Sequence, residues 1–453
     1  MHPILSKSTY LYGLQCIKRL YLYKKHYHLA NPIDETNQAV FQTGTDVGEL
    51  AQSLFSNGVN AQGDEPYHSE KTAKQTAALL ANHDVIYEAA FIYNDVICAV
   101  DILVRKNNTY YAFEVKSTTK LKPQHIEDAA LQYYVLSNAG IDLADFSIVV
   151  LNNEYVRQGN LNLDALFNPI SVLKFLDDKQ VFIAENISRL KKVVWLKSIP
   201  EVEMGGHCNS PYECSFTQYC LSQSPQELVE EIELDNAINV NKEAWVEFSD
   251  ELQYPLHFFD FESISYALPE FDNSRPYQQI VFQYSLHIQK KAKSNFIHKA
   301  FLGDGVKDPR LALIKQMIKD LGKKGSIVVW NISFEKTVIS KLAIDFPEYA
   351  DELLALNERM VDLMNPFRPN RKIVLSEAFQ GSFSLKAVLP IVAPELSYAN
   401  LNIQEGGTAS FKYGQLKEMN ELEKTQVRQD LLDYCHLDTL AMLKVWEKIN
   451  ELV

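Results

Sequence analysis

Three cysteines lie at equal intervals near the middle of the chain: Cys208, Cys214 and Cys220, within GGHCNSPYECSFTQYC. A tetrahedral zinc ion or a cubane iron–sulfur cluster normally takes four protein ligands, so this spacing predicts a metal site that lacks one ligand. The fold must therefore bring a fourth ligand to this segment from elsewhere. His207 is a poor candidate, because it adjoins Cys208 and adjacent side chains usually point apart.

The cysteine content also indicates the compartment. Six cysteines in 453 residues are too few and too scattered for a secreted disulfide scaffold, which favours a reducing environment. The start of the chain carries Lys7 and many polar groups where a signal peptide needs an apolar core, and no later stretch approaches the roughly 20 apolar residues of a membrane span. We expect a cytoplasmic protein with no membrane partner.

Length and pattern predict two domains joined by a connector. We place the first domain at residues 1–222, an acidic connector at 223–250 and the second domain at 251–453. The net charge of −14 argues against a general nucleic-acid coat, because phosphate binding depends on Lys and Arg. It is compatible with a nuclease, whose metal-binding carboxylates add negative charge.

The second half of the chain has the pattern of a mixed-sheet α/β domain. Strand-like runs come first, then a strand and helices alternate, and a long helix ends the chain. The predicted strands lie at 256–263, 279–289, 296–302 and 326–331, and the predicted helices at 308–322, 333–346 and 425–452.

A first group of chemically active residues lies in NDVICAVDILVRKNNTYYAFEVKSTT, which reads as two strands joined by the turn KNN. Asp101 is on the first strand. Glu114 and Lys116 share one face of the second, while Phe113 and Val115 share the other. Two carboxylates that hold Mg²⁺ or Mn²⁺, with a lysine beside the attacking water, suit phosphodiester cleavage. The alternative is an exposed hairpin with an incidental ion pair.

Residues 1–222 resemble the PD-(D/E)xK nuclease superfamily, in particular its RecB-like branch with an iron–sulfur cluster, which includes the CRISPR adaptation nucleases. Besides the carboxylate pair and lysine, the resemblance rests on YEAAF, with Glu88, and AALQYYVL, with Gln132. It implies a restriction-endonuclease-like core. It also implies metal binding by Glu88, Asp101 and Glu114, and catalytic roles for Asp101, Glu114, Lys116 and Gln132.

The same resemblance implies the missing cysteine ligand. RecB-like cluster proteins place one cysteine near the N-terminus and three after the nuclease core, which makes Cys16, in GLQCIKRLYL, the fourth. It also implies a 4Fe–4S cluster, although four thiolates alone suit either the cluster or zinc. Cys98 and Cys435 are expected to be buried small apolar residues. Glu49 stands where many RecB-like members have a histidine metal ligand.

A second group of acids lies in the C-terminal half. Asp260 and Glu262, in FFDFES, share a strand face, and Tyr434 and Asp438 share a helix face. Glu335 lies between them in VVWNISFEK, where a strand gives way to a helix. Acids from these elements suit two divalent ions that clamp the attacking and leaving oxygens. The alternative, surface charge, fits poorly with Asp260, whose neighbours are phenylalanines.

This half resembles the DEDD exonucleases of the RNase H-like fold, with Asp260 and Glu262 in the first motif and Tyr434 and Asp438 in the third. In the second motif Glu335 replaces the usual aspartate, so either Glu335 or Asp362 would complete the set. The resemblance implies metal binding by Asp260, Glu262, Glu335 and Asp438, with Tyr434 as a further catalytic residue. RPYQQIVFQYSLH, ERMVDLMNPFR and GSFSLKAVLP also look like an uncharacterised domain fused behind RecB-like nucleases in bacterial proteins.

These features predict a metal-dependent nuclease with two catalytic modules, a PD-(D/E)xK nuclease and a DEDD-type 3′-to-5′ exonuclease. The expected cofactors are a 4Fe–4S cluster and Mg²⁺ or Mn²⁺, and the expected partner is nucleic acid, DNA in preference to RNA. One alternative is a nucleic-acid-binding or scaffold protein with an inactive C-terminal module. Another is a redox-sensing regulator whose cluster carries the function.

Overall fold

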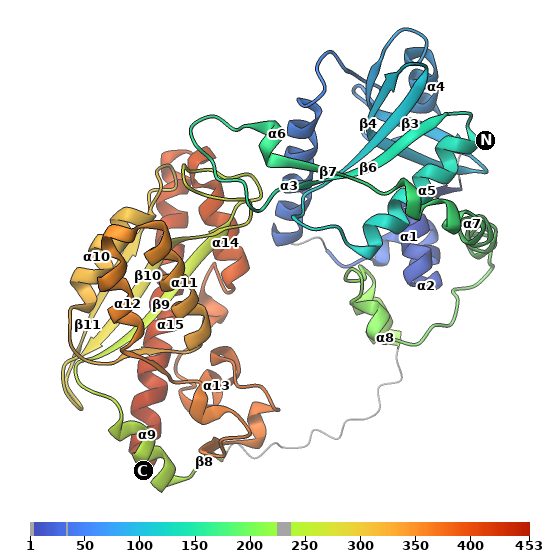
Figure 1. Ribbon diagram of the computed structural model, residues 1–453. Helices are drawn as coiled ribbons and strands as arrows, with labels where there is room; N and C mark the ends of the chain where they lie inside the picture. Colours follow the sequence, from blue (N-terminus) through green and yellow to red (C-terminus); the bar gives the residue numbers. More distant parts are fainter. Residues whose placement is uncertain (1–3, 33–34, 224–236) are drawn as a thin grey trace. The chain divides into compact units, whose positions relative to one another are not determined.

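A computed structural model of the protein describes residues 4–32, 35–223 and 237–453 (Figure 1). The chain forms two compact units. Of the described residues, the first unit comprises 4–32, 35–223 and Ala267–Pro276, and the second comprises 237–266 and Tyr277–Val453. Both contain helices and mixed sheets, which confirms the predicted α/β class.

The sheet of the first unit has seven strands in the order β2-β3-β4-β5-β6-β7, with β1 added alongside β4. Strands β3, β4 and β5 form an antiparallel meander, whereas β6 lies parallel to β5. The strand bounds are Leu5–Ser6 (β1), Val59–Asn60 (β2), Val85–Tyr93 (β3), Val96–Lys106 (β4), Thr109–Lys116 (β5), Leu143–Leu151 (β6) and Phe167–Ser171 (β7).

Helices cover both faces of this sheet. One core includes Val100 and Ala112 of the sheet with residues of α1, α2, α5 and α7, and the other includes Phe113 and Val115 with Val47 of α3. The alternation predicted for β5 is therefore confirmed. The helices are α1 (Lys7–Gln15), α2 (Ile17–Lys25), α3 (Glu35–Gln52), α4 (Glu70–Leu79), α5 (Pro123–Asn138), α6 (Leu163–Leu166), α7 (Gln180–Val194) and α8 (Thr217–Gln223).

The sheet of the second unit has five strands in the order β11-β10-β9-β12-β13. The first three are antiparallel, and β12 and β13 run parallel to β9. The bounds are Leu256–Ser265 (β9), Gln279–Gln289 (β10), Phe296–Leu302 (β11), Ile327–Val329 (β12) and Met360–Asp362 (β13).

Two cores lie on opposite faces of this sheet. Phe259 and Phe261 pack against α10, α11 and α12, whereas Phe258 packs on the other face with α13 and α15 (Figure 1). This split follows from the alternation of side chains along β9. The helices are α10 (Arg310–Leu321), α11 (Ile332–Asp345), α12 (Ala350–Asn357), α13 (Leu385–Val392), α14 (Gly406–Gln415) and α15 (Glu421–Leu452).

Part of the segment predicted as a connector lies outside the described residues. Within it, β8 (Asn239–Val240) pairs with β14 (Val374–Leu375), and α9 (Lys242–Asp250) follows. Trp245 of α9 is fully buried in the second unit, beside Trp446. Residues 239–250 therefore belong to the packed second unit.

Local sequence signals explain several boundaries. The two strands of the first predicted site are joined by Asn107 and Asn108, both with positive φ, as a two-residue hairpin turn requires. Gly322 ends α10 with φ 54°, as predicted. The helix predicted at 308–322 begins later in the structure, at Arg310, with Pro309 at the N-cap position. Among the described residues, no helix combines the length and apolarity needed to cross a bilayer.

Two glycines of the second unit give a matched test of backbone packing. Gly322 and Gly325 both have positive φ, but a Cβ would meet nothing within 4 Å at Gly322 and would lie 2.0 Å from the Pro255 carbonyl oxygen at Gly325. We predict that Gly325→Ala lowers the free energy of unfolding by about 1–3 kcal/mol more than Gly322→Ala, because only it adds a collision to the backbone strain. Urea unfolding followed by tryptophan fluorescence measures the difference, and equal losses would contradict the predicted collision.

Candidate functional site

Three carboxylates stand side by side on neighbouring strands of the first unit. Glu88 and Asp101 both lie between the β3–β4 pairs Tyr87–Ile102 and Ala89–Val100, and Glu114 lies one residue beyond the β4–β5 pair Ile102–Phe113. The regular ladder is interrupted there, because Glu88 has φ 52° and Asp101 Oδ2 accepts a hydrogen bond of 2.5 Å from the N–H of Val115. Residues directly opposite in a sheet share a face, so the strands bring these acids together.

Two lysines converge on this row of acids. Lys7 Nζ, at the start of α1, and Lys116 Nζ, at the end of β5, each lie 2.7 Å from Glu114 Oε1. Asp128 of α5 lies beside both, with Oδ2 2.5 Å from Lys116 Nζ and 3.7 Å from Lys7 Nζ. Two cations and two anions therefore form one compact network.

The charges of this network set its protonation states. Burial raises the pKa of Asp101 well above its usual range, and Glu114 adds to the rise. Burial would also raise the pKa of Asp128, but attraction to Lys116 and Lys7 holds it below its usual range. Burial lowers the pKa of Lys116, yet Asp128 and Glu114 outweigh that effect and raise it. Lys116 is therefore held in its charged form at neutral pH.

The remaining predicted residues of this unit lie around the network. Gln132 is fully buried, and its Nε2 donates to Asp128 Oδ1 at 3.2 Å. Glu88 Oε2 lies 3.3 Å from His68 Nε2. Glu49 is exposed on α3. The structure therefore places Asp101 near Glu88 and Glu114 and near Lys7 and Lys116. Gln132 contacts this group through its hydrogen bond to Asp128.

Sequence reasoning missed Lys7 and Asp128. Asp128 stands four residues before Gln132, a helical spacing that could have identified it. No local sequence pattern identifies Lys7, because the pairing of β1 with β4 is what brings it near Glu114. Glu114 Oε2 is buried and accepts no hydrogen bond within the described residues. An unpartnered carboxylate oxygen beside Asp101 fits a hard divalent cation such as Mg²⁺ or Mn²⁺.

The four predicted cysteine ligands line a single small pocket in the first unit. Cys16 joins α1 to α2, and Cys208, Cys214 and Cys220 come from residues 206–220. Gln15 binds the two segments together, because its Nε2 donates to the carbonyl oxygens of His207 and Tyr212, at 2.7 Å each. His207 also lines the pocket, and its Nε2 lies 3.8 Å from Cys208 Sγ.

The thiols of this pocket interact electrostatically. Burial raises the pKa of Cys214, and the nearby Cys16 and Cys220 add to the rise. Burial likewise raises the pKa of Cys220, which Lys18 opposes and Cys16 and Cys208 reinforce. Bound metal would relieve this repulsion, because it stabilises thiolates. Four sulfur donors with apolar walls and nearby cations fit an iron–sulfur cluster or zinc.

In the second unit, ligand atoms from β9 and α15 gather at one place. Asp260, Glu262 and Cys435 each present one oxygen or sulfur within 4.8 Å of the other two. Cys435 was expected to be a buried apolar residue; it is buried, but its thiol faces carboxylates. Burial raises its pKa well above the usual range, and Asp260 and Glu262 add to the rise. The thiol therefore stays protonated at neutral pH.

Asp438 and Glu335 complete this group of buried acids. Burial raises the pKa of Asp260 well above its usual range, and repulsion from Asp438, then from Glu262 and Glu335, reinforces the rise. Burial raises the pKa of Asp438 to about 6. The structure therefore brings together the four acids that the sequence selected. Their repulsion is the condition that a divalent cation would relieve.

Glu335 and Asp362, the two acids between which the sequence left the choice open, have different surroundings. Glu335 is 2% exposed, one turn inside α11, and its Oε2 has no hydrogen-bond partner among the described residues. Burial raises its pKa to about 8. Asp362 instead receives hydrogen bonds from the N–H of Met364 at 3.1 Å and from Arg368 Nη2 at 3.3 Å. Glu335 thus keeps one oxygen without a hydrogen-bond partner among the described residues, and its charge acts on Asp260.

Two tyrosines and a lysine border the acids. The Tyr398 hydroxyl donates to Asp438 Oδ1 at 2.6 Å, and Lys386 Nζ lies 5.3 and 5.5 Å from the ring centroids of Tyr398 and Tyr434. Burial raises the pKa of Tyr434 above its usual range, as do Asp438 and Glu262, so its hydroxyl stays protonated. Tyr398 and Lys386 carried no sequence signal, because neither shares an element with the acids.

Comparisons with known proteins assign no activity. Residues 257–384 match the model of a domain of unknown function, DUF2779. This range contains Asp260, Glu262 and Glu335 but ends before Tyr434 and Asp438.

The chain is similar to an uncharacterized protein, MG366, of Mycoplasma genitalium (30% identity over 221 residues, 43% of this chain and 32% of that protein). It is also similar to the MG366 homolog of Mycoplasma pneumoniae (28% over 226 residues, 46% and 33%) and to UU173 of Ureaplasma parvum (28% over 219 residues, 43% and 31%). The chain spans about a third of the length of these curated relatives.

The cysteine pocket predicts that Cys16 and Cys214 act as one ligand set. Cys16→Ser should remove bound metal as completely as Cys214→Ser, because four thiolates hold the group jointly. Metal and acid-labile sulfide in anaerobically purified protein give the measurement. Cys98→Ala, which alters a buried cysteine of β4 outside the pocket, is the control and should keep the full content. Full metal content in Cys16→Ser would exclude this residue as a ligand.

Proposed function

We propose that the chain is a metal-dependent nuclease with two hydrolytic sites, a PD-(D/E)xK site in the first unit and a DEDD-type 3′-to-5′ exonuclease site in the second. The observation that carries the proposal is the meeting of Asp260 and Glu262 of β9, Glu335 of α11 and Asp438 of α15, all with raised pKa values. Buried acids drawn from three elements fit two divalent ions.

The architecture of each unit supports this proposal. The first unit places its acids on a three-stranded meander followed by α5 and the parallel strand β6, as expected for a restriction-endonuclease-like core. In the second, three antiparallel strands are extended by two parallel ones, as expected for an RNase H-like sheet. Within this second sheet, β12 ends at Val329, and the chain leaves the sheet at that point. Glu335 follows on α11.

In the second unit, the residues divide the work of hydrolysis between binding and orientation. Asp260, Glu262, Glu335 and Asp438 would hold Mg²⁺ or Mn²⁺, which polarises the phosphate and lowers the pKa of a bound water. Tyr434 keeps its proton at neutral pH and can donate a hydrogen bond to that water or to the phosphate. Tyr398 orients Asp438 through its hydroxyl.

In the first unit, Asp101 and the unpartnered Oε2 of Glu114 would hold the ion, with Glu88 next to them. Lys116 is a fixed cation beside Glu114, so it stabilises negative charge that develops on the phosphate and does not remove a proton. Lys7 neutralises the other oxygen of Glu114. Gln132 orients Asp128, which holds Lys116 in place.

We propose that the four cysteines hold a 4Fe–4S cluster that ties the N-terminal helices to residues 206–220. The role of the cluster would be structural, because its ligands come from the same two segments that the Gln15 hydrogen bonds join. Coordination by all four cysteines would hold these segments together more firmly. Iron with sulfide in the metal analysis supports the cluster, and zinc without iron that is lost in Cys214→Ser opposes it. We propose nucleic acid, DNA in preference to RNA, as the substrate, and the cytoplasm as the compartment.

Glu335 replaces the aspartate that is usual in the second motif, and this replacement gives the sharpest test of the proposal. Glu335→Gln should lower 3′-to-5′ digestion by about a hundredfold or more, because a misplaced or missing metal ligand disrupts the reacting geometry. Asp362→Asn is the matched control and should reduce digestion only modestly, since Arg368 and Met364 already hold that carboxylate. Both changes are made in a Lys116→Ala background that silences the first unit, and digestion is followed on 5′-labelled single-stranded DNA with Mn²⁺.

Two outcomes would contradict the assignment. If Glu335→Gln digests at the parental rate while Asp362→Asn is inactive, the ligand is Asp362. If the Lys116→Ala parent and both variants are inert on every DNA and RNA tested, the second unit is a nucleic-acid-binding module that lacks catalysis, and the exonuclease proposal fails.

A further inference from the structure

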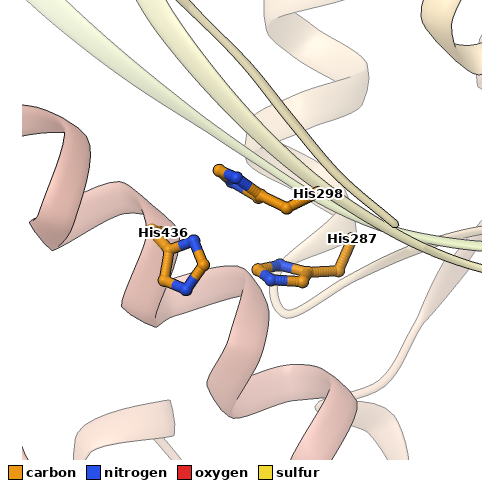
Figure 2. A group of neighbouring side chains, drawn as sticks. All are labelled: His287, His298 and His436. Atoms are coloured by element: carbon orange, nitrogen blue, oxygen red, sulfur yellow. The ribbon is translucent and has the colours of Figure 1, made fainter. Parts of the chain in front are cut away.

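A cluster of three histidines occupies the second unit outside the carboxylate site. His287 of β10 and His298 of β11 are direct partners in the β10–β11 ladder, and His436 of α15 closes over them (Figure 2). The ring centroids lie 4.6 Å apart for His287 and His298, 4.7 Å for His287 and His436, and 4.3 Å for His298 and His436. One ring nitrogen of each lies within 4.8 Å of one nitrogen of each of the others.

The ring of His287 is fixed in one orientation by a hydroxyl. His287 is fully buried, and its Nδ1 lies 2.8 Å from Thr439 Oγ1, also fully buried. Its Nε2 is buried and has no hydrogen-bond partner anywhere in the described chain. A histidine that donates Nδ1–H to a neighbour presents the lone pair of Nε2, which is the arrangement typical of a metal-binding histidine.

A second hydroxyl extends this support to His298. Ser285 Oγ lies 2.7 Å from Thr439 Oγ1 and 3.0 Å from His298 Nε2. Two hydroxyls from β10 and α15 therefore orient two of the three rings. Hydrogen-bonded supports of this kind hold ligands in place around protein metal sites.

The Nε2 of His287 has no hydrogen-bond partner among the described residues, and its ring lies against two other imidazoles. Packed in this way without a ligand, the rings leave one buried nitrogen unsatisfied, which is costly. A bound cation would remove that cost.

We propose that His287, His298 and His436 form a site for a divalent transition metal of the zinc class. Three imidazoles with a position left for water are a known donor set for Zn²⁺, whereas Mg²⁺ and Mn²⁺ prefer oxygen. Tetrahedral zinc holds its nitrogen ligands about 3.3 Å apart, so side-chain rotations that close each gap by roughly 1.5 Å or less complete the site. The inference does not depend on nuclease activity.

The position of this site suggests what it does. Ser285 lies directly opposite Asp260 in the β9–β10 ladder, and His287 follows on the same face of the sheet. His436 stands on α15 between Tyr434 and Asp438. A metal bound by the histidines would clamp α15 onto β10 and β11 and so hold Tyr434 and Asp438 against β9. We assign it a positioning role.

Zinc uptake by the full chain tests the site. After equilibrium dialysis against micromolar zinc, His298→Ala and His436→Ala should each hold one zinc fewer per chain than the parent. His83→Ala, in the first unit, is the control and should bind as the parent does. Zinc should also raise the thermal midpoint of the second unit in the parent and in His83→Ala but not in the two cluster variants.

Cobalt separates this site from the cysteine pocket. Histidine-bound Co²⁺ lacks the thiolate-to-cobalt charge-transfer band that cysteine ligands produce. The His298 and His436 variants should therefore bind less cobalt but keep that band. His298→Gln and His436→Gln repeat the test with side chains that keep a polar contact, should either alanine variant fail to fold by circular dichroism. Equal zinc uptake by the parent and by all folded cluster variants would overturn the proposal.

Discussion

Mutual repulsion of buried carboxylates is the interaction on which the second unit depends. Asp260, Glu262, Glu335 and Asp438 come from β9, α11 and α15, and burial raises the pKa of each. Lys386 opposes the rise at Glu262 and Asp438 but does not cancel it. The fold thus gathers more acidic groups in one place than its own cations can keep ionised, so these groups retain protons, and a divalent cation that replaced the protons would be a fitting partner.

Two buried acids of the first unit, unlike those of the second, are paired with lysines. Lys7 and Lys116 lie against Glu114 and Asp128, so much of that site is neutralised by the chain itself. Asp101 is the acid whose pKa stays raised there. A metal in the first unit would therefore contribute less to folding than one in the second. The cysteine pocket is a third case, in which hydrogen bonds from Gln15 join the two segments that carry the cysteines.

The sequence predicted those features that local spacing encodes. Asp101 with Glu114 and Lys116, Asp260 with Glu262, and Tyr434 with Asp438 follow from the periods of strands and helices. Residues that only long-range packing brings to the sites were not predicted, such as Lys7, Tyr398 and Lys386. The histidine cluster escaped for the same reason, because it needs the register between β10 and β11. Likewise, β9, β10, β11 and β12 were predicted from the sequence, whereas β13 and the strand order β11-β10-β9-β12-β13 were not.

The thermal midpoint of the second unit, measured at pH 5 and pH 8 with Mn²⁺ or with chelator, tests most directly whether Asp260 and its neighbours form a cation site. Folded-state pKa values of about 6 for Asp438 and about 8 for Glu335 lie above the unfolded values of 3.8 and 4.5. The folded state therefore binds more protons between about pH 4 and 8, and these groups lose their stabilising effect as the pH rises. We predict that Mn²⁺ raises the midpoint strongly at pH 8 and little at pH 5, and that Asp260→Asn weakens the response. A midpoint at pH 8 that is indifferent to Mn²⁺, or an undiminished response in Asp260→Asn, would contradict the account.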